Sequence, residues 1–479
     1  MTSLAHYDVV VIGSGQGGTP LCQAFVKSGL KTALIESRHV GGCCVNEGCS
    51  PTKTMIASGR VAYLVNRAKE YGVNIKGEIT VDQRRVKERK QEIVDSFREG
   101  GEKTLKESGV DLLTGVARFL DSKTIAVIDT SGQEIQRLTA DKIFVNTGER
   151  PVEPPIDGLK GEFAKGVILD STSIQELDVV PEHLVVVGGG YIGIEFGQLF
   201  RRLGSAVSVI QRGRQLFPRE DREVAEAVKN ILEEDGLAVY LQTAVQSISP
   251  GPEGCGATVL YKTESGDVES LNASHVLIAT GRRPNTDELN LEAASVKLDS
   301  KGYIKVNDLL ETSQSHIWAL GDVKGPPAFT HVSYDDYRIL KANLIDHKGD
   351  PSQHRSIKDR DLIAPYVAYM DPQLAHVGLH EHEARERFPD HTIKTATMPM
   401  SYVARALETD ETRGLMKAVV DMDTDRILGF TCLGLEGGEI MSVVQMAMMG
   451  GTKWTVLQDA VWAHPTLAES LNNLWGFLK

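Results

Sequence analysis

The chain has 479 residues, a formal net charge of −13 and 41% hydrophobic residues. This length exceeds what one hydrophobic core supports, so we expect two to four domains. The acidic balance and the lack of a basic tract exclude nucleic acid and anionic membranes as expected partners. Six cysteines in so long a chain are no disulfide framework and favour a reducing compartment. The longest early apolar run, Val9 to Ile12, is too short for a signal peptide or a membrane span, so we expect a cytoplasmic protein.

The N-terminal region has the pattern of a dinucleotide-binding fold. In order, the chain reads as a strand (7–12), the glycines Gly13, Gly15 and Gly18, a helix (19–28), a strand (31–35) and then Glu36. Gly13 makes the turn, Gly15 lets the backbone approach a pyrophosphate, and Gly18 lets helix and strand pack closely. The phosphate is expected at the helix N-terminus, and Glu36 is expected to accept hydrogen bonds from a ribose.

The same pattern recurs 175 residues later. A strand (184–187) precedes Gly188, Gly190 and Gly193, and a helix (194–203) and a strand (207–210) follow. Two fingerprints indicate two bound dinucleotides or an internal duplication. Gln211 occupies the position that Glu36 has in the first fold, and Arg212 and Arg214 follow it. An acid at this position binds the free ribose 2′-hydroxyl of NAD, whereas nearby arginines can bind the 2′-phosphate of NADP. The missing acid and the two arginines therefore favour NADP over NAD. In the alternative interpretation, the two arginines are only solvated charges on a loop. The glycine, rather than alanine, at Gly193 also favours NAD.

Other segments predict how these folds are joined. The stretches 143–151 (IFVNTGERP) and 277–285 (LIATGRRPN) are near copies, and each is expected where the chain passes between domains. The charged stretch from 63 to 109 is expected to be largely helical, and 121–138 to form a hairpin. A strand at 317–323 ends on Gly321-Asp322. Beyond residue 346, strands (365–370, 416–421, 427–433) precede helices (437–449, 456–463), which indicates an α+β domain.

The stretch Gly41–Lys53 (GGCCVNEGCSPTK) carries Cys44 and Cys49, five positions apart. On a regular helix two such residues are about 7.5 Å apart along the axis and point in different directions. A disulfide needs Cα atoms within about 4.4–6.8 Å. If the pair is bridged, the intervening backbone must therefore be distorted, which Gly48 allows. A strained, accessible disulfide is typical of a redox site, whereas two unrelated thiols are the alternative.

Taken together, these motifs resemble the flavin-dependent pyridine nucleotide–disulfide oxidoreductases, which include dihydrolipoamide dehydrogenase, glutathione reductase and mercuric reductase. The resemblance covers essentially the whole chain and also includes ATGRRPN, ALGD and HPTLAE at 464–469. Within this family, the sequence is most similar to proteins described as mercuric reductase-like. The resemblance implies an α/β enzyme with a FAD-binding domain (1–150 and 275–345), an NAD(P)H-binding domain (151–274) and a dimerisation domain (346–479).

The resemblance also implies roles for individual residues. Cys49 is implied as the thiolate facing the flavin, and Cys44 as the thiol that exchanges with substrate. Lys53 is implied to pair with Glu195 beside the flavin, and His464, held by Glu469, to serve as acid–base in the partner subunit's site. The residues implied to contact FAD are Gly13, Gly15, Gly18, Glu36, Gly42, Cys43, Lys53, Ala117, Thr147, Gly148, Asp322 and Thr330. Those implied to contact NADPH, with NADH possible, are Gly188, Gly190, Tyr191, Gly193, Gln211, Arg212 and Gly281.

Three departures from the family pattern bear on the substrate. Cys43 stands where the motif usually has threonine, either as a third thiol or as a small residue near the pyrophosphate. No cysteine follows Cys432, so the C-terminal pair by which mercuric reductases bind Hg(II) is missing. The chain also begins at the flavin fold without a metal-carrying domain. With His464 in place of the mercuric reductase tyrosine, these features favour a small-molecule or protein disulfide as substrate.

We therefore expect a homodimeric enzyme that passes electrons from NAD(P)H through FAD to Cys44–Cys49 and on to a disulfide, with no bound metal. A metal-ion reductase that uses the cysteines as soft ligands is one alternative. A non-catalytic FAD-binding subunit is another, although the set of cysteines, Lys53 and His464 argues against it.

Overall fold

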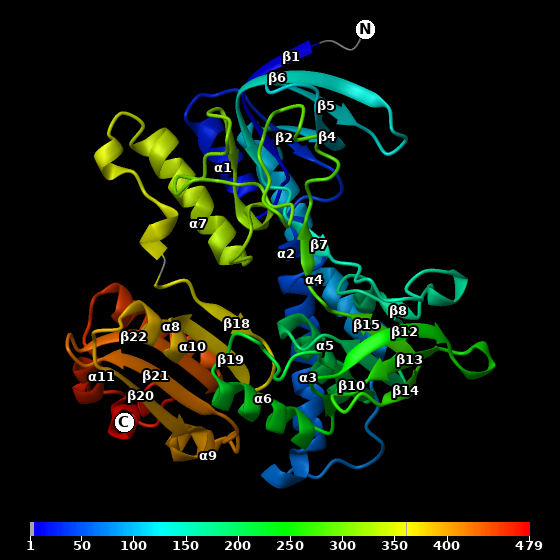
Figure 1. Ribbon diagram of the computed structural model, residues 1–479, viewed down its shortest axis with the longest axis vertical. Coiled ribbons are helices and arrows are strands. Elements are labelled where there is room, and N and C mark those ends of the chain that lie inside the picture. Colours follow the sequence, from blue (N-terminus) through cyan, green and yellow to red (C-terminus); the bar gives the residue numbers. More distant parts are fainter. Residues whose placement is uncertain (1–3, 361) are drawn as a thin grey trace. The chain divides into compact units, whose positions relative to one another are not determined.

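The computed structural model describes residues 4–360 and 362–479. These residues form two compact units (Figure 1). Unit 1 contains the chain up to residue 54, residues 88–152 and residues 281–359, and unit 2 contains residues 55–87, 153–280 and the chain from 360 to its end. Among the described helices, none is long and apolar enough to cross a membrane. The division into three domains stays a prediction.

Unit 1 is built on a seven-stranded sheet of order β3-β2-β1-β6-β5-β4, with β17 also paired to β6. Its strands are β1 (Leu4–Ile12), β2 (Thr32–Glu36), β3 (Asp111–Thr114), β4 (Val116–Phe119), β5 (Thr124–Ile128), β6 (Glu134–Val145) and β17 (Ile317–Ala319). Strands β3, β2, β1 and β6 pair in parallel in that order, and β17 also pairs in parallel with β6. Strands β4, β5 and β6 pair antiparallel and form the excursion that the sequence predicted.

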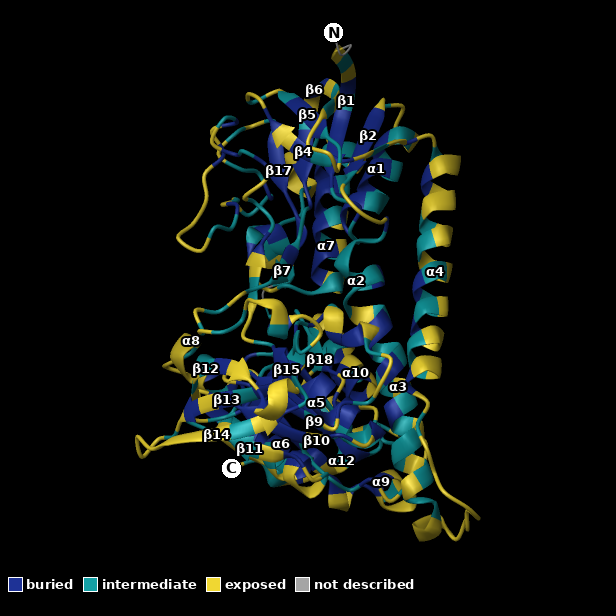
Figure 2. Cartoon of the chain, turned by 90° about the vertical axis from the view of Figure 1, so that its right-hand side faces the viewer, coloured by how far each residue is buried: buried dark blue, intermediate teal, exposed yellow. Residues whose placement is uncertain are grey.

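Both faces of this sheet are buried, which explains why its central strands are apolar at consecutive positions. Val9 and Val11 face a core with Phe25 and Ile339, from helices α1 (Gly18–Lys27) and α7 (Thr330–Lys341). Val10 belongs to the core on the other face. Figure 2 shows β2 mostly buried and β1 and β6 buried towards their carboxyl ends, whereas α4 (Gln83–Ser108) has a largely exposed outer face. The carboxyl ends of the parallel strands therefore form a rigid edge on which a site can be built.

The second halves of the two near-copy segments lie side by side in unit 1. Strands β7 (Glu149–Pro151) and β16 (Arg282–Pro284) pair antiparallel, with Glu149 opposite Pro284 and Pro151 opposite Arg282. The resemblance between the two segments is thus accompanied by direct pairing.

Unit 2 contains the second nucleotide fold, a parallel sheet of order β11-β10-β9-β15-β8. Its elements are β8 (Ile168–Leu169), β9 (His183–Val187), α5 (Tyr191–Leu203), β10 (Ala206–Ile210), α6 (Arg222–Glu234), β11 (Ala238–Tyr240) and β15 (His275–Ile278). An antiparallel sheet joins β12 (Ala244–Pro250), β13 (Ala257–Lys262) and β14 (Val268–Ala273). This arrangement agrees with the predicted strand–glycine turn–helix–strand order.

The C-terminal part of unit 2 is the predicted α+β region. Its sheet has the order β18-β19-β22-β21-β20, and α10 packs against β19 and β22 (Figure 1). The elements are β18 (Tyr366–Ala368), β19 (Gln373–Gly378), α8 (Glu381–Arg387), β20 (Ile393–Pro399), α9 (Ala404–Glu408), β21 (Leu415–Asp421), β22 (Arg426–Gly434), α10 (Gly437–Met449), α11 (Trp454–Asp459) and α12 (Ser470–Asn473).

One helical prediction needs correction. The helix predicted at 456–463 ends at Asp459, because Ala460 is extended and the Asn472 side chain donates hydrogen bonds to the last carbonyls of α11. The stretch from 63 to 109 is helical over most of its length, as predicted, with a break at residues 72–82. Helix α3 (Cys49–Asn66) ends early and is followed by a short 3₁₀ turn, Gly72 adopts a left-handed φ of 76°, and α4 begins only at Gln83. A left-handed residue cannot continue a right-handed helix.

Candidate functional site

The two cysteines lie on consecutive helices, at positions that both belong to unit 1. Cys44 is in α2 (Gly42–Asn46), and Cys49 is the first residue of α3. Glu47, with φ −141°, interrupts the helical path between them, and a Cβ added at Gly48 would lie 3.1 Å from the Sγ of Cys43. The backbone between the cysteines is therefore broken, as a close thiol pair requires, and glycine keeps the space beside Cys43 open.

Cys44 and Cys49 are free thiols that hydrogen-bond to each other. This hydrogen bond raises the pKa of Cys44 well above its ordinary value, and burial and the charge of Cys49 raise it further. When the pair carries one negative charge, Cys44 is therefore the thiol that keeps its proton. The Sγ of Cys49 also lies 3.4 Å from the hydroxyl of Thr330, at the start of α7, and it is the more exposed of the two.

Cys43 is a third thiol beside this pair. Burial raises the pKa of Cys43 to about 11, against the opposing effect of Arg282, whose Nη2 lies 3.5 Å from the sulfur. Arg282 also donates to the backbone oxygen of Glu149 at 2.8 Å and lies 3.5 Å from its carboxylate. The arginine thus joins Cys43 to the paired strands β7 and β16.

The raised pKa predicts slow alkylation of Cys43. At pH 7.5, a thiol of pKa about 11 is a thiolate only about 0.03% of the time, roughly three-hundredfold less than an unperturbed cysteine of pKa about 8.5. In native protein treated with iodoacetamide, peptide mass spectrometry should show Cys43 modified at least tenfold more slowly than the exposed Cys255. The rate at Cys43 should rise about tenfold per pH unit up to pH 10. Equal rates at the two cysteines would contradict this assignment.

The first glycine motif forms a cradle that no side chain could share. Gly13 has φ 100°, and a Cβ there would lie 2.4 Å from the backbone oxygen of Asn146. A Cβ at Gly18 would lie 2.2 Å from the oxygen of Gly13, and one at Gly15 would lie 3.0 Å from the Asn146 amide nitrogen. These contacts fix the turn between β1 and α1, whose backbone N–H groups can bind a pyrophosphate.

Glu36 ends β2 next to this turn. Its Oε2 accepts hydrogen bonds from the backbone N–H of Ser14 at 3.0 Å and from the Ser14 hydroxyl at 2.6 Å. Gly42 lies against the same turn, with φ 63° and no room for a Cβ beside Gly15. The glycine turn, the acid and the start of α2 are therefore brought together, and the contact of Glu36 with a ribose stays a prediction.

The remaining predicted FAD contacts in unit 1 come from the edge of the same sheet. Thr147 donates to the backbone oxygen of Asn285 at 2.8 Å, and Gly148 follows it with φ 67°. Ala117 is buried in β4. Asp322, just after β17, is partly buried, and burial raises its pKa although Arg282 and Lys324 oppose the rise. Lys53 follows Cys49 by one turn of α3.

The second glycine motif repeats this geometry in unit 2. A Cβ at Gly188 would lie 2.4 Å from the backbone oxygen of Ala279, and one at Gly193 would lie 2.2 Å from the oxygen of Gly188. Gly190 caps α5 with open space beside it, and the partly exposed Tyr191 begins that helix. Gly281, predicted to contact the same coenzyme, belongs to unit 1 and has φ 138°.

Gln211 is turned into this second cradle. Its Oε1 accepts from the backbone N–H of Gly189 at 3.3 Å, and its Nε2 donates to the backbone oxygen of Gln215 at 3.1 Å. The neutral amide thus occupies the acid's position and supports the turn, whereas Arg212 and Arg214 are exposed on the loop after β10. Neither arginine forms an ion pair with another described residue.

The predicted acid–base group belongs to unit 2. The Nδ1 of His464 lies 2.9 Å and 3.1 Å from the two carboxylate oxygens of Glu469, and the imidazole is largely exposed. This contact orients the ring and leaves Nε2 directed to another partner. Glu195 is also in unit 2, buried in α5, where it accepts from the backbone N–H of Tyr369 at 2.7 Å.

Sequence reasoning missed Asn146 and Arg282. Asn146 donates to the oxygen of Gly13 at 3.1 Å and packs against the glycine turn, and Arg282 contacts Cys43. Both lie in the near-copy segments, and comparing the copies could have identified them. Asn146 corresponds to Ala279, and Glu149 corresponds to Arg282, so the copies differ at the two positions that act on the first site.

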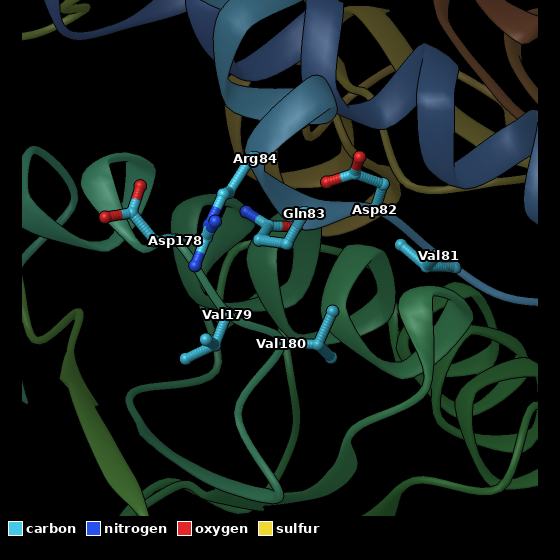
Figure 3. Close-up of a pocket in the computed structure, with 7 residues that line it drawn as sticks. All are labelled: Val81, Asp82, Gln83, Arg84, Asp178, Val179 and Val180. Carbon is cyan, nitrogen blue, oxygen red and sulfur yellow. The ribbon is translucent and has the colours of Figure 1, made fainter.

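A cavity of about 450 Å³ lies elsewhere in unit 2, at the N-terminus of α4 (Figure 3). Residues 81–84 and 178–180 line it. It contains none of the residues that the sequence singled out.

Comparison with known proteins agrees with this geometry. Residues 7–336 match the family described as pyridine nucleotide-disulphide oxidoreductase, and residues 364–474 match its dimerisation domain. The chain is 35% identical to a probable pyridine nucleotide-disulfide oxidoreductase, RclA, of Escherichia coli, over 99% of each chain. It is 35% identical to a mercuric reductase of Staphylococcus aureus, over 97% of this chain and 81% of that protein. A dihydrolipoyl dehydrogenase of Thermus scotoductus is 33% identical, over 97% and 96%.

Among solved structures, the Cu(II) complex of the HOCl-induced flavoprotein disulfide reductase RclA from Escherichia coli superimposes with a TM-score of 0.87. It is 34% identical and covers 99% of this chain and 100% of that one. Two glycine cradles and a paired-cysteine element define a two-nucleotide oxidoreductase. The chain belongs to the pyridine nucleotide–disulfide oxidoreductase family. Its predicted fold class and its identity as an oxidoreductase are confirmed.

Membership of this family implies FAD and a pyridine nucleotide as cofactors. The residues present fit both groups. A Cβ at Gly13, Gly18, Gly188 or Gly193 would lie 2.2–2.4 Å from a backbone oxygen, so only glycine allows these tight turns, and the space beside Gly190 is open.

Proposed function

We propose that this flavoprotein takes electrons from NADPH, and less effectively from NADH, and passes them through Cys44 and Cys49 to a disulfide substrate. The observation that carries the proposal is the hydrogen-bonded pair of Cys44 and Cys49, with Thr330 beside Cys49. Bound FAD would accept the electron pair from the coenzyme and deliver it to the cysteine pair. The dithiol product of that reduction corresponds to the free thiols of the structure.

The thiol chemistry then follows from the two protonation states. The sulfur of Cys44 attacks the substrate disulfide, forming a mixed disulfide and releasing one substrate thiolate. Cys44 must lose its proton in this step, and the released thiolate must gain one. An imidazole near its ordinary pKa can carry out this exchange. Cys49 then attacks Cys44, which releases the second substrate thiol and leaves the Cys44–Cys49 disulfide, so that two electrons have moved to the substrate.

We assign the proton transfer to His464 of the partner subunit. The family's dimerisation domain matches residues 364–474, and His464 lies within it. A two-fold dimer would then contain two equal sites, each made from the cysteines of one subunit and the histidine of the other. The contact between His464 and Glu469 supports this role, because it holds the ring while Nε2 faces outward. The cysteine content supports the cytoplasm as the compartment.

A stoichiometric titration tests the proposal. Under anaerobic conditions, the FAD-loaded enzyme should accept two electron pairs per subunit, one at the cysteines and one at the flavin. The first pair should produce a long-wavelength thiolate–flavin band before free reduced flavin accumulates. Alkylating the reduced cysteines should remove the capacity for one pair. Uptake of only one pair by untreated enzyme would refute the proposal.

Coenzyme choice can be tested at Arg212. A charge-assisted contact to a 2′-phosphate typically contributes about 1.5–3 kcal/mol, so Arg212→Ala should lower kcat/KM for NADPH by about tenfold or more. The value for NADH should change by less than about twofold, since that coenzyme has no phosphate there. Arg219→Ala, an exposed arginine farther along the same loop, is the matched control. Equal kcat/KM for the two coenzymes in the wild type would refute the assignment.

Reduction of a metal ion is a second candidate, because the solved relative is a Cu(II) complex and this chain has the additional Cys43. Two groups of described residues have histidine or acidic ligand atoms that all lie within 4.8 Å of one another, and the three thiols do not form such a group. We therefore rank the disulfide substrate first and expect Hg(II) to inhibit. Sustained NADPH oxidation coupled to metal reduction, in the absence of any disulfide, would reverse this ranking.

A further inference from the structure

A second cluster of chemically active side chains lies within unit 2, outside the nucleotide cradles. Glu220 directly precedes the residue that caps α6, Tyr366 begins β18, His376 is in β19, and His380 caps α8. Strands β18 and β19 pair antiparallel, with Tyr366 opposite His376. Glu220, His376 and His380 are 6%, 3% and 3% exposed. The fold thus brings one carboxylate and two imidazoles together in a buried position, from segments more than 150 residues apart.

The hydrogen bonds of this cluster leave a ligand atom unused. Tyr366 donates to Oε1 of Glu220 and lies 3.3 Å from Nε2 of His380. His376 is bonded through Nδ1 to the hydroxyl of Thr431 at 2.8 Å and through Nε2 to the oxygen of Gly378 at 3.1 Å. Oε2 of Glu220 is buried and has no hydrogen-bond partner among the described residues. Buried polar atoms without partners are uncommon in folded proteins and call for an explanation.

Among the described residues, none forms an ion pair with Glu220, although the charge of Arg219 acts on the cluster from a distance. The charged groups around it are the carboxylates of Asp221 and Glu383, together with Arg219. Arg219 is exposed and does not contact the carboxylate within ion-pairing distance. A buried carboxylate without a cation is costly, and a metal ion would supply the missing charge.

We propose that Glu220, His376 and His380 form a binding site for a divalent first-row transition metal ion, of which Zn²⁺ fits best. Each residue offers one ligand atom, and the three atoms lie within 4.8 Å of one another. Two imidazoles and one carboxylate are a common ligand set for zinc, with a fourth position for water. Tyr366 and Thr431 would be the outer partners that orient the ligands.

Binding requires a small local rearrangement. The rings of His376 and His380 are stacked, with centroids 3.9 Å apart and an angle of 13° between their planes. Because a metal binds in the plane of an imidazole, one ring must rotate out of the stack. If His376 binds through Nε2, its bond to the oxygen of Gly378 is exchanged for the metal, while Nδ1 keeps Thr431. An ion here would tie the segment before α6 to the C-terminal sheet.

The test must separate this site from the reactive thiols. We would use the full-length, FAD-loaded protein with Cys43→Ser, Cys44→Ser and Cys49→Ser as the parent, and measure Zn²⁺ by equilibrium dialysis and elemental analysis. We expect one ion per subunit. Glu220→Gln and His376→Gln should each weaken binding by more than about tenfold, and Tyr366→Phe by about tenfold, as loss of an outer partner does. Co²⁺ in the parent should give visible bands without the intense near-ultraviolet thiolate absorption.

His391→Gln is the matched control, because His391, Asp421 and Asp423 form the other group of close ligand atoms. There His391 already bonds to Asp421 at 2.8 Å, and Asp423 accepts from the backbone N–H of Thr392. Zn²⁺ should raise the thermal midpoint of the parent and of His391→Gln, but not that of Glu220→Gln. Each variant must keep the FAD absorbance and the metal-free midpoint of the parent. The proposal is overturned if the parent binds no Zn²⁺, or if His391→Gln loses binding while Glu220→Gln keeps it.

Discussion

Replacing Cys49 by serine should lower kcat for NADPH-dependent disulfide reduction by more than about a thousandfold, as loss of a reacting nucleophile does. Without the second sulfur, the mixed disulfide on Cys44 cannot be resolved and no internal disulfide forms. Incubation with substrate should therefore leave Cys44 covalently joined to half of the substrate. Intact mass spectrometry should detect that adduct in Cys49→Ser and not in Cys44→Ser.

The control for this prediction is Cys255→Ser. Cys255 is also exposed, but it lies near the end of the β12–β13 connection in unit 2. Its replacement should leave kcat and KM within about twofold of the wild type, since a surface substitution away from the site has little effect. Both variants should retain the flavin absorbance of the wild type. More than about a tenth of the wild-type activity in Cys49→Ser would show that the pair does not carry the electrons.

Replacing Asp371 by asparagine should destabilise the protein by about 3–5 kcal/mol, the usual effect of breaking a buried ion pair. The Asp371 side chain is 14% exposed and contacts Arg60 at 2.7 Å and Arg202. Arg202 is 6% exposed, and its Nε already lacks a hydrogen-bond partner. Without the carboxylate, this guanidinium loses its closest counter-charge. The urea midpoint at pH 7, read by fluorescence, should fall accordingly.

The pH dependence gives the same prediction a second test. Burial by itself would raise the pKa of Asp371, but Arg202 and Arg60 hold it below its ordinary value. The folded state therefore favours the carboxylate. Its contribution to stability is complete above about pH 4, the ordinary aspartate pKa, and is lost as the pH falls through the lower, folded-state pKa. The difference between wild type and Asp371→Asn should thus shrink as the pH falls below 4.

Asp287→Asn is the matched control for that substitution. Asp287 also pairs with an arginine, Arg150, but its side chain is 55% exposed. An exposed ion pair contributes about 0–1 kcal/mol, so the urea midpoint should change little. Equal shifts in the two variants would show that burial does not decide the strength of the Asp371 contacts.

Much of the fold could be predicted from the sequence because its signals are local. The nearest atom that excludes a Cβ at Gly18 is the backbone oxygen of Gly13, five residues before it, so this part of the turn is set by the local sequence. The buried strands β1 and β9 are continuous apolar runs because both faces of a parallel sheet are covered. Helix ends were less predictable, since the end of α11 depends on the side chain of Asn472, thirteen residues beyond Asp459.

The sequence by itself determined the fold class, the two nucleotide cradles and the paired-cysteine element. Only the tertiary structure decided which distant groups act on them. Arg282 reaches Cys43 across 239 positions, because β16 pairs with β7 in a register that no local pattern encodes. Asn146 supports the glycine turn across 133 positions because β6 lies parallel to β1. Likewise, Glu220 meets His376 and His380 only because α6, α8 and the C-terminal sheet belong to one compact unit, where burial removes water as the alternative partner for their polar atoms.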